Sequence, residues 1–269
     1  MSRGGRTGGF VPRSLVVPAV LGIGFLVLPL VALVGRVEWA TFAADITSPV
    51  ALSALGLSLG TGLTATAICV LVGVPLALLI ARSGARVAAV LRALVTVPLV
   101  LPPMVGGVAL LYLFGRNGWF GDILGGIGVR LPFTTAAVVL AQTFVALPFL
   151  VLALEGSLRA TGTRFEETAA ALGAGRWTVL RRITLPLAAP GLIAGTVLCF
   201  ARAIGEFGAT ALFAGNAPGV TQTMPLAIYT AFNGSGVAQS TAVALALLLL
   251  ATAVLVLLLV RAWRPGAVR

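Results

Sequence analysis

The segment Glu167-Thr-Ala-Ala-Ala-Leu-Gly173, followed after nine residues by Ile183-Thr-Leu-Pro186, is a polar island in an otherwise apolar chain. Charged residues gather in and around it, among them Arg164, Glu166 and Arg176. Because charges are costly inside a bilayer, a charged segment of this length between two apolar runs has to lie in water. What the island contacts there is the first functional question that the sequence poses.

The composition of the chain indicates a membrane protein. Its 269 residues are 59% hydrophobic and only 9% charged, whereas a soluble domain carries about 25% charged residues. Apolar runs of about 20 residues can each cross a bilayer as a helix, and the first run is too long for a signal peptide. The sequence therefore predicts an all-α integral membrane protein with six transmembrane helices, at residues 15–34, 57–80, 95–114, 134–154, 188–213 and 240–260.

The basic charge of the chain is not placed as in a nucleic-acid-binding protein. The net charge is +11, but all 18 basic residues are arginines that lie between apolar runs, which is the placement that fixes membrane topology. Histidine is absent, so sites that hold zinc or haem through imidazole are excluded. The two cysteines, Cys69 and Cys199, lie inside predicted spans, where we expect them to pack rather than to form a disulfide or bind a metal.

Arginine placement also predicts the orientation of the spans. With the N-terminus in the cytoplasm, fourteen of the 18 arginines fall in cytoplasmic segments, and only Arg36, Arg116 and Arg130 fall outside. Because cytoplasmic loops carry the excess of arginine, both termini are expected in the cytoplasm. The predicted divisions are a cytoplasmic tail at 1–14, a six-helix membrane domain at 15–260 with a cytoplasmic loop at about 159–186, and a second cytoplasmic tail at 261–269.

A run of prolines and glycines from Pro98 to Gly107 interrupts the third predicted span. Proline frees backbone carbonyls, and membrane helices tolerate it where neighbouring helices or a water-lined cavity bind those groups. We therefore expect this helix to be kinked or broken. Two interpretations stay open: a moving pathway or gate that includes Pro102, Pro103 and Met104, or a helix bent only for packing.

The polar island predicts two short helices joined by a glycine turn. Thr163-Arg-Phe-Glu166 has the form of a capping box, and the acidic residues that follow suit the positive end of a helix. Gly173 allows a sharp turn, and a second helix is expected at 177–183, ended by Pro186. The resulting knob presents apolar side chains among charges, as expected for insertion into a partner's groove. These side chains are Leu172, Trp177 and Val179.

The island resembles the cytoplasmic loop of ABC-transporter permeases of the binding-protein-dependent import type. The family pattern is Glu-Ala-Ala, three residues, Gly, nine residues and Ile-x-Leu-Pro, with Thr168 here in place of the first alanine. The resemblance implies a type I importer fold, in which this loop is a coupling helix lodged in a cleft of an ATP-hydrolysing subunit. The residues expected to couple to that subunit are Glu166, Glu167, Ala169, Leu172, Gly173, Trp177, Ile183, Leu185 and Pro186.

The chain lacks the nucleotide-binding loop that ATP hydrolysis needs. No Gly-x-x-x-x-Gly-Lys-Ser/Thr pattern occurs, and there is no lysine to complete one. We therefore expect neither enzymatic activity nor a bound cofactor, with ATP and Mg²⁺ held by the partner. The resemblance implies a bacterial cytoplasmic membrane as location, and as partners two copies of an ATPase subunit, an extracytoplasmic oxyanion-binding protein, a second copy of this chain and membrane lipid, without nucleic acid.

The fifth predicted span carries the paired charges Arg202 and Glu206. Four residues apart, they are expected to share one helix face, in the outer half of the membrane. Charges at membrane depth are usually paired or line a pathway, so an outer gate and an internal ion pair both stay open. The candidate pathway residues are Pro102, Pro103, Met104, Arg202, Glu206, Phe207 and Thr210.

The stretch from Arg202 to Tyr229 resembles molybdate permeases. The residues that carry this resemblance are Gly205-Glu-Phe-Gly-Ala-Thr210, Ala214-Gly-Asn-Ala-Pro-Gly-Val-Thr-Gln-Thr223 and Pro225-Leu-Ala-Ile-Tyr229. Sulfate permeases share only Gly-Glu-Phe-Gly and an Ala/Ser-Gly-Asn stretch. The resemblance implies import of molybdate, with tungstate, by alternating access, and sulfate or thiosulfate is the alternative cargo. A short surface helix is expected at 225–232 in this outer region.

Two other classes of function are weighed against transport. A membrane-embedded enzyme needs a catalytic constellation within the spans, but histidine is absent and the acids there are only Glu206 and the terminal-turn Glu155. A non-transporting membrane scaffold makes no such demand. Because a scaffold could also bind an ATPase, only a transport measurement separates it from a permease.

Overall fold

The computed structural model describes residues 13–234 and 239–262, and these residues form helices joined by turns. The predicted tails at 1–14 and 261–269 fall almost wholly outside this range. The helices that form the body are α1 (Val16–Gly35), α3 (Pro49–Arg82), α4 (Ala85–Val100), α5 (Pro103–Phe114), α7 (Thr135–Thr161), α10 (Leu185–Ile204) and α13 (Gln239–Ala262). The shorter helices are α2 (Trp39–Ile46), α6 (Gly121–Gly126), α8 (Arg164–Ala171), α9 (Arg176–Val179), α11 (Gly208–Phe213) and α12 (Met224–Phe232).

Within the described residues, five helices are long and apolar enough to cross a bilayer. The bent pair α4–α5 passes the same test when it is counted as one span, which gives six. The helix α3 begins well before the predicted residue 57, because Pro49 suits the first helical turn and the hydroxyl of Ser48 accepts a hydrogen bond from the Ala51 N–H at 3.2 Å. The prediction of an all-α fold with six spans is therefore confirmed, with changed boundaries.

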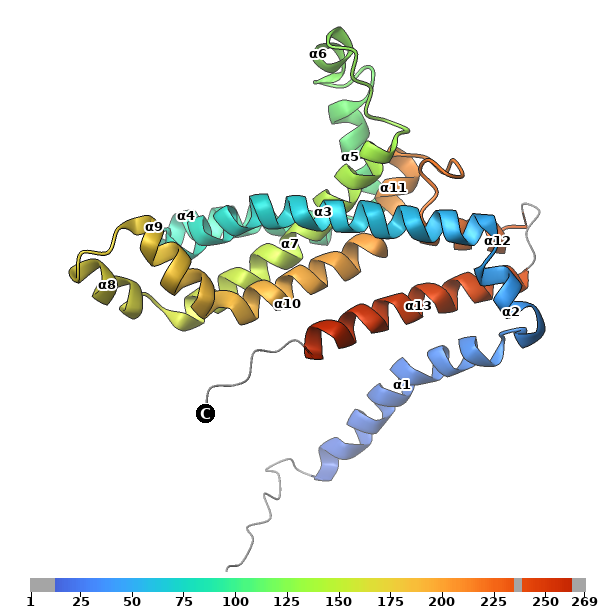
Figure 1. The fold of residues 1–269 in the computed structure, drawn as a ribbon, viewed down its shortest axis with the longest axis horizontal. Helices are drawn as coiled ribbons and strands as arrows, with labels where there is room; N and C mark the ends of the chain where they lie inside the picture. Colours follow the sequence, from blue (N-terminus) through green and yellow to red (C-terminus); the bar gives the residue numbers. More distant parts are fainter. Residues whose placement is uncertain (1–12, 235–238, 263–269) are drawn as a thin grey trace, which may run out of the picture.

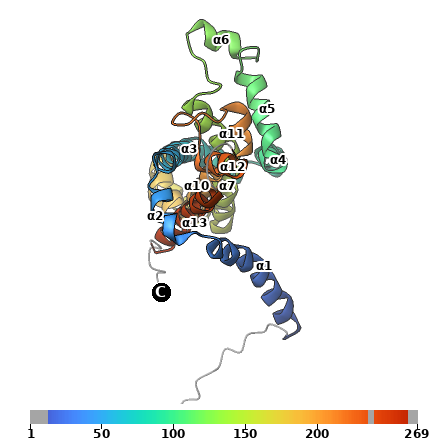
Figure 2. The same cartoon turned by 90° about the vertical axis from the view of Figure 1, so that its right-hand side faces the viewer.

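The centre of the bundle is α7, which packs along α3 and α10 (Figures 1 and 2). Small side chains fill the contact, among them Ala65, Ala146 and Ala203. Small residues let membrane helices approach closely, so dispersion contacts replace the hydrophobic driving force that lipid removes. Cys69 and Cys199 belong to the same buried cluster as free thiols, which confirms their expected packing role.

The third span is broken. The helices α4 and α5 meet at an angle of 110°, because Leu101 and Pro102 each precede a proline and adopt extended backbone conformations. Beyond the break, α5 and α6 leave the bundle sideways, as both views show (Figures 1 and 2). We call residues 103–133 the arm. The predicted break is thus confirmed, and it redirects the chain rather than bending it slightly.

The fifth span differs from its prediction at both ends. It was expected as one helix over 188–213, but α10 ends at Ile204, and Glu206 starts a new turn by accepting the Ala209 N–H at 2.7 Å. At the other end, one continuous helix runs from Arg176 to Ile204. Pro186 therefore does not end a helix, because a π turn just before it, at Leu180–Thr184, accommodates the missing N–H.

The outer helix α12 is half buried, although it was expected on the surface. Its Met224 N–H donates to the hydroxyl of Ser58 on α3 at 2.7 Å, and Leu226 and Ala227 are buried. The helix packs against α13 and α3. The first N–H groups of a helix have no partner within the helix, so this bond to a buried hydroxyl lowers the cost of burying the start of α12. A sequence pattern does not reveal such a distant partner.

Candidate functional site

The polar island forms the predicted helix, glycine turn and helix. After α8, Gly173 has a φ of +84°, a conformation that side chains with a Cβ disfavour. The Ala174 N–H donates to the carbonyl of Ala169 at 3.0 Å, and the Gly173 N–H to that of Ala170 at 3.0 Å. These two bonds are the Schellman pattern that ends a helix. The glycine of the family pattern is therefore required by backbone geometry.

The predicted capping box does not form. Thr163 makes no capping bond, and its hydroxyl donates to a carboxylate oxygen of Glu167 at 2.6 Å instead. The carboxylate of Glu166 turns the other way, accepting from Nη2 of Arg82 at 2.5 Å and from the hydroxyl of Thr184 at 2.8 Å. A charged partner at Arg82 outcompetes the backbone N–H that a capping box would satisfy, because charge-assisted hydrogen bonds are the stronger ones.

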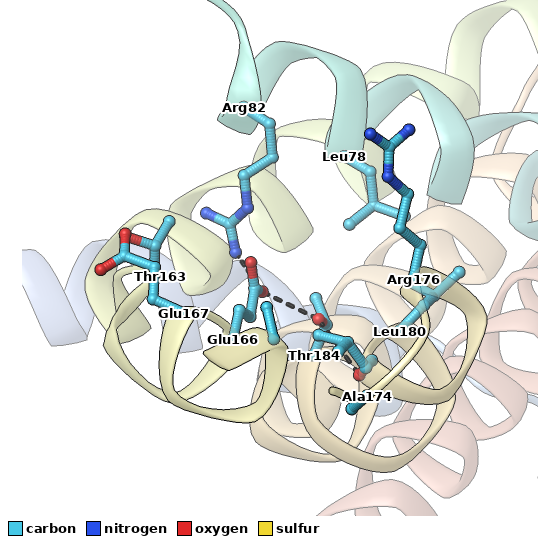
Figure 3. Close-up of a pocket in the computed structure, with 11 residues that line it drawn as sticks. Leu78, Arg82, Thr163, Glu166, Glu167, Ala174, Arg176, Leu180 and Thr184 are labelled. Atoms are coloured by element: carbon cyan, nitrogen blue, oxygen red, sulfur yellow. Dashed lines mark hydrogen bonds and ion pairs between the residues drawn. The ribbon is translucent and has the colours of Figure 1, made fainter. Parts of the chain in front are cut away.

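Glu166 lies in a hollow of about 580 Å³ between α3, α8 and the start of the fifth span. Figure 3 shows its carboxylate between Arg82, from the last turn of α3, and Thr184, from the π turn. Its side chain is 20% exposed. One carboxylate therefore ties the island to two spans, and it faces the body of its own chain rather than a partner. Arg82 and Thr184 were not among the predicted residues, and no local pattern marks them.

The island also carries large apolar side chains that are exposed. Phe165 is 58% exposed, Leu172 85% and Trp177 66%, and the guanidinium of Arg181 lies 5.4 Å from the centre of the Trp177 ring. Exposed apolar side chains clustered among charges are typical of a docking surface. We call Phe165, Leu172, Trp177 and Arg181 the docking face.

The other predicted coupling residues support the island rather than belong to the docking face. Glu167 and Pro186 are exposed, whereas Ala169, Ile183 and Leu185 are half buried. Val179, expected to be exposed, is half buried and lines the hollow beside Glu166, because the continuous helix turns it toward α8. No observation tests the coupling role of any of these residues, so it stays a prediction.

A second ion cluster, missed by the sequence analysis, joins α4 to α7. The carboxylate of Glu155 is 3% exposed and accepts from Nη2 of Arg92 at 2.5 Å and from Nε of Arg159 at 2.7 Å. Arg159 follows Glu155 by one helical turn, which a pattern could suggest, but Arg92 lies 63 residues away. The cluster fixes the first half of the broken span to the helix that leads into the island.

The structure brings the two halves of the predicted pathway together. A Cβ on Gly208 would lie 2.9 Å from the Cβ of Pro103 and 3.1 Å from the Met104 nitrogen. On the next turn, a Cβ on Gly107 would lie 2.8 Å from the carbonyl oxygen of Ala209. The break in the third span and the break in the fifth span are therefore packed backbone to backbone, which only glycine permits. Their role in transport stays a prediction.

The predicted pair of Arg202 and Glu206 forms an ion pair at 2.6 Å. Glu206 is 1% exposed, and it bonds the α11 backbone as well as facing Arg202. The ring of Phe207 packs on Tyr229, with centroids 5.0 Å apart, and Thr210 is fully buried. These contacts establish the pair, while its two interpretations, an outer gate and an internal ion pair, both remain.

The fold resembles that of solved importers. The chain superposes on a bacterial ABC transporter involved in the import of the acidic polysaccharide alginate, with a TM-score of 0.68, covering 92% of each chain at 17% identity. A likeness at this identity describes the fold alone.

Comparison of sequences finds relatives of higher identity. The chain is 54% identical to the molybdenum transport system permease protein ModB of Mycobacterium tuberculosis over 81% of its own length and 83% of that protein. It is 46% identical to the Escherichia coli protein of the same name over 53% of its length and 62% of that protein. Residues 73–267 match the family described as binding-protein-dependent transport system inner membrane component. The chain is therefore a multi-pass inner-membrane protein and a member of this family of transport permeases.

Proposed function

We propose that this chain is the membrane-spanning permease subunit of an ATP-driven importer whose cargo is molybdate, with tungstate as a close analogue. The observation that carries the proposal is the 54% identity to a molybdenum permease over 81% of the chain. Import of sulfate, the alternative cargo, finds no comparable support among these relatives.

The energy for transport comes from a separate ATPase subunit in this proposal. The sequence contains no phosphate-binding loop, and the docking face is a cytoplasmic surface that its own chain leaves uncovered. Leu172 and Trp177 are suited to an apolar cleft on that subunit, because exposed side chains of this size lose unfavourable contact with water on binding. Two ATPase subunits would bind the two islands of a dimer.

The contacts of Glu166 give the island a route to the spans. When ATP closes the two ATPase subunits, the islands move with them, and each Glu166 transmits the movement to α3 through Arg82 and to α10 through Thr184. The Glu155 cluster links α7 to α4, which ends at the break beside Pro102. A movement of these packed helices as rigid bodies switches access from one side of the membrane to the other.

A second copy of the chain is supported by surfaces that one copy leaves uncovered. No residue of α1 is buried, and α6, at the far end of the arm, stands away from the bundle (Figure 1). Lipid can cover apolar helices, but the irregular backbone at residues 115–120 and 127–133 of the arm needs protein or water around it. A homodimer with the path at its interface meets this need, and an extracytoplasmic oxyanion-binding protein would deliver the cargo there.

The test is uptake of labelled molybdate and labelled sulfate by cells that lack their own systems and express this chain with its ATPase and binding protein. We expect molybdate uptake that tungstate inhibits and that disappears when the ATPase cannot hydrolyse ATP. Sulfate uptake without molybdate uptake would contradict the cargo. Assembly with the ATPase but uptake of neither oxyanion would identify a scaffold instead.

A further inference from the structure

The arm contains a hollow that the coupling and pathway residues do not explain. Its volume is about 470 Å³, large enough for a small hydrated anion. Its walls come from the end of α5, the turn before α6, α6 itself and the irregular segment that leads to α7. The side chains that matter for its chemistry are Leu111, Phe114, Arg116, Asp122, Arg130 and Phe133.

Two arginines without an ion pair in the described part of the chain line this hollow. Within residues 13–234 and 239–262, neither Arg116 nor Arg130 forms an ion pair or a side-chain hydrogen bond. By contrast, Arg82, Arg92 and Arg202 each pair with a glutamate. A guanidinium presents five N–H donors in a planar fork that matches an oxyanion. Two such forks on one hollow are therefore suited to bind an anion from two sides.

The turn that holds Arg116 is rigid. The Trp119 N–H donates to the carbonyl of Tyr112 at 3.2 Å and the Phe120 N–H to that of Leu113 at 2.9 Å. A Cβ on Gly121 would lie 2.6 Å from the carbonyl oxygen of Arg116, so only glycine fits there. This close backbone packing fixes the Arg116 Cα at the rim of the hollow. A fixed origin lowers the entropy that its side chain loses when it binds an ion.

The wall opposite carries backbone strain. Phe133 has a φ of +62°, and among the described residues it is the one with a side chain that takes a positive φ. Its N–H donates to the carbonyl of Phe213 at 3.2 Å, and a Cβ on Gly215 would lie 3.1 Å from its ring. Strained residues persist where the surrounding structure holds them, and they cluster at functional sites. Phe133 therefore contacts the end of α11 as well as lining the hollow. The predicted pathway residues of the fifth span lie shortly before that end in the sequence.

We propose that this hollow is an entry site for a tetrahedral oxyanion, bound by the guanidinium groups of Arg116 and Arg130 on the outer side of the membrane. The ligand class is a small dianion such as molybdate, tungstate or sulfate, and the role as an entry site rests on the proposed transport function. Leu111 and Phe114 are half buried, whereas Arg116 and Arg130 are exposed, so their guanidinium groups are accessible to an ion from bulk solvent.

Asp122 sets the strength of this site. Its carboxylate lines the same hollow and also has no partner within the part of the chain that the structure describes. One negative charge against two positive charges leaves a net attraction for a dianion but weakens it. An entry site has to release its ion toward the path, so weak binding suits it. Removing the acid should therefore tighten binding, whereas removing either arginine should loosen it.

The direct test is the modification of arginines by phenylglyoxal in the complete transporter, purified as wild type and followed residue by residue with mass spectrometry. Sodium molybdate should slow the modification of Arg116 and Arg130 and leave that of Arg36 unchanged. Arg36 is the matched control, because it also lies in a predicted outer segment but lines no part of the hollow. Sodium sulfate that protects the same two residues would support an oxyanion site that does not select among dianions.

Variants of the arginines and of Asp122 are expected to change the affinity for molybdate in opposite directions. The molybdate concentration that gives half-maximal protection of the remaining arginine should rise roughly tenfold in Arg116→Gln or Arg130→Gln, since one charged hydrogen-bonding partner is lost. It should fall in Asp122→Asn and stay constant in Arg36→Gln. Initial uptake rates at low molybdate should fall in Arg116→Gln and Arg130→Gln and stay unchanged in Arg36→Gln. Asp122→Asn keeps the size of the side chain, so it tests the site even where an arginine variant assembles poorly.

The outcomes separate this inference from the proposed function. If wild-type transporter takes up molybdate but no dianion protects Arg116 or Arg130, the entry site is wrong and the permease function stands. Loss of binding-protein docking in the arginine variants, without protection by molybdate, would assign the hollow to a protein contact and overturn the inference. Protection without any oxyanion uptake by wild-type transporter would keep the anion site and contradict the transport function.

Discussion

The guanidinium of Arg82, in the last turn of α3, lies 2.5 Å from a carboxylate oxygen of Glu166, in the first turn of α8. The same oxygen accepts a hydrogen bond from Thr184, at the start of the fifth span. Two spans that are far apart in the sequence therefore meet the island at one atom. A partner that moves the island therefore pulls on both spans together.

Replacing Arg82 with Gln should weaken coupling between ATP hydrolysis and uptake. The pair is 28% and 20% exposed, so its loss costs only about 1 kcal/mol and leaves the protein folded. We expect uptake per ATP hydrolysed to fall about fivefold, because about 1 kcal/mol changes the equilibrium between two conformational states by about that factor. The measurement is molybdate uptake and ATP hydrolysis in the same proteoliposomes.

The matched control for this variant is Arg86→Gln. Arg86 lies exposed in the first turn of α4 and makes no ion pair within the described residues. The exchange Arg82→Glu with Glu166→Arg should recover part of the coupling, because it restores the pair with its charges reversed. Equal loss in the Arg86 and Arg82 variants would show that cytoplasmic charge, and not this contact, is responsible.

Replacing Gly173 with Ala should loosen the turn between α8 and α9. A Cβ there meets no neighbouring atom, so the cost comes from its φ of +84° alone and amounts to about 1 kcal/mol. Gly156→Ala is the control, since Gly156 is helical and a Cβ there also meets nothing. We expect faster proteolysis of the island and lower uptake in the first variant, and neither change in the second. Unchanged uptake in Gly173→Ala would contradict the need for this turn geometry.

Much of the fold follows from local sequence. The length of the apolar runs predicts the spans, and the prolines at 102 and 103 predict the break, because each constrains the residue before it. Gly173 predicts the turn after α8 for a similarly local reason. Each of these features is decided by a few neighbouring residues, so a pattern in the sequence contains the cause.

The failed predictions concern choices between local and distant partners. Glu166 was expected to cap its own helix, but Arg82, 84 residues away, binds it instead. Glu206 was expected to continue a helix, but its carboxylate binds the backbone of the next one. The Glu155 cluster depends on Arg92 from another span. Such outcomes depend on packing that brings the partners together, and a single sequence does not state it.

Truncating the docking face should weaken assembly with the ATPase. Trp177→Ala removes the ring that lies against Arg181, and exposed tryptophans of this kind dominate interfaces. A loss of about 2 kcal/mol corresponds to roughly thirtyfold weaker binding. The measurement is the amount of ATPase that copurifies with the chain over a series of ATPase concentrations.

The control for the docking face is Tyr112→Ala on the arm. Tyr112 is also a large exposed aromatic residue, at 75%, but it lies far from the island along the chain and in the fold (Figure 1). Its variant should bind the ATPase as wild type does. Should Trp177→Ala bind equally well, the contact with the ATPase must lie elsewhere, and Glu167 and Arg164 would be the next residues to replace.

Arg202 and Glu206 can be tested as a pair, because their two interpretations predict different double variants. Arg202→Ala leaves the carboxylate of Glu206, 1% exposed, without its cation, and we expect a loss of about 3–5 kcal/mol that lowers the amount of folded protein. Arg202→Met combined with Glu206→Gln removes both charges and keeps an acceptor for the Ala209 N–H, so it should restore folding. Because Glu206 is buried and its carboxylate also holds α11, we expect molybdate uptake to recover with folding, as measured per folded transporter. If the double variant folds but its uptake is altered, the pair belongs to the gate, since its charges would then be needed only while an anion crosses.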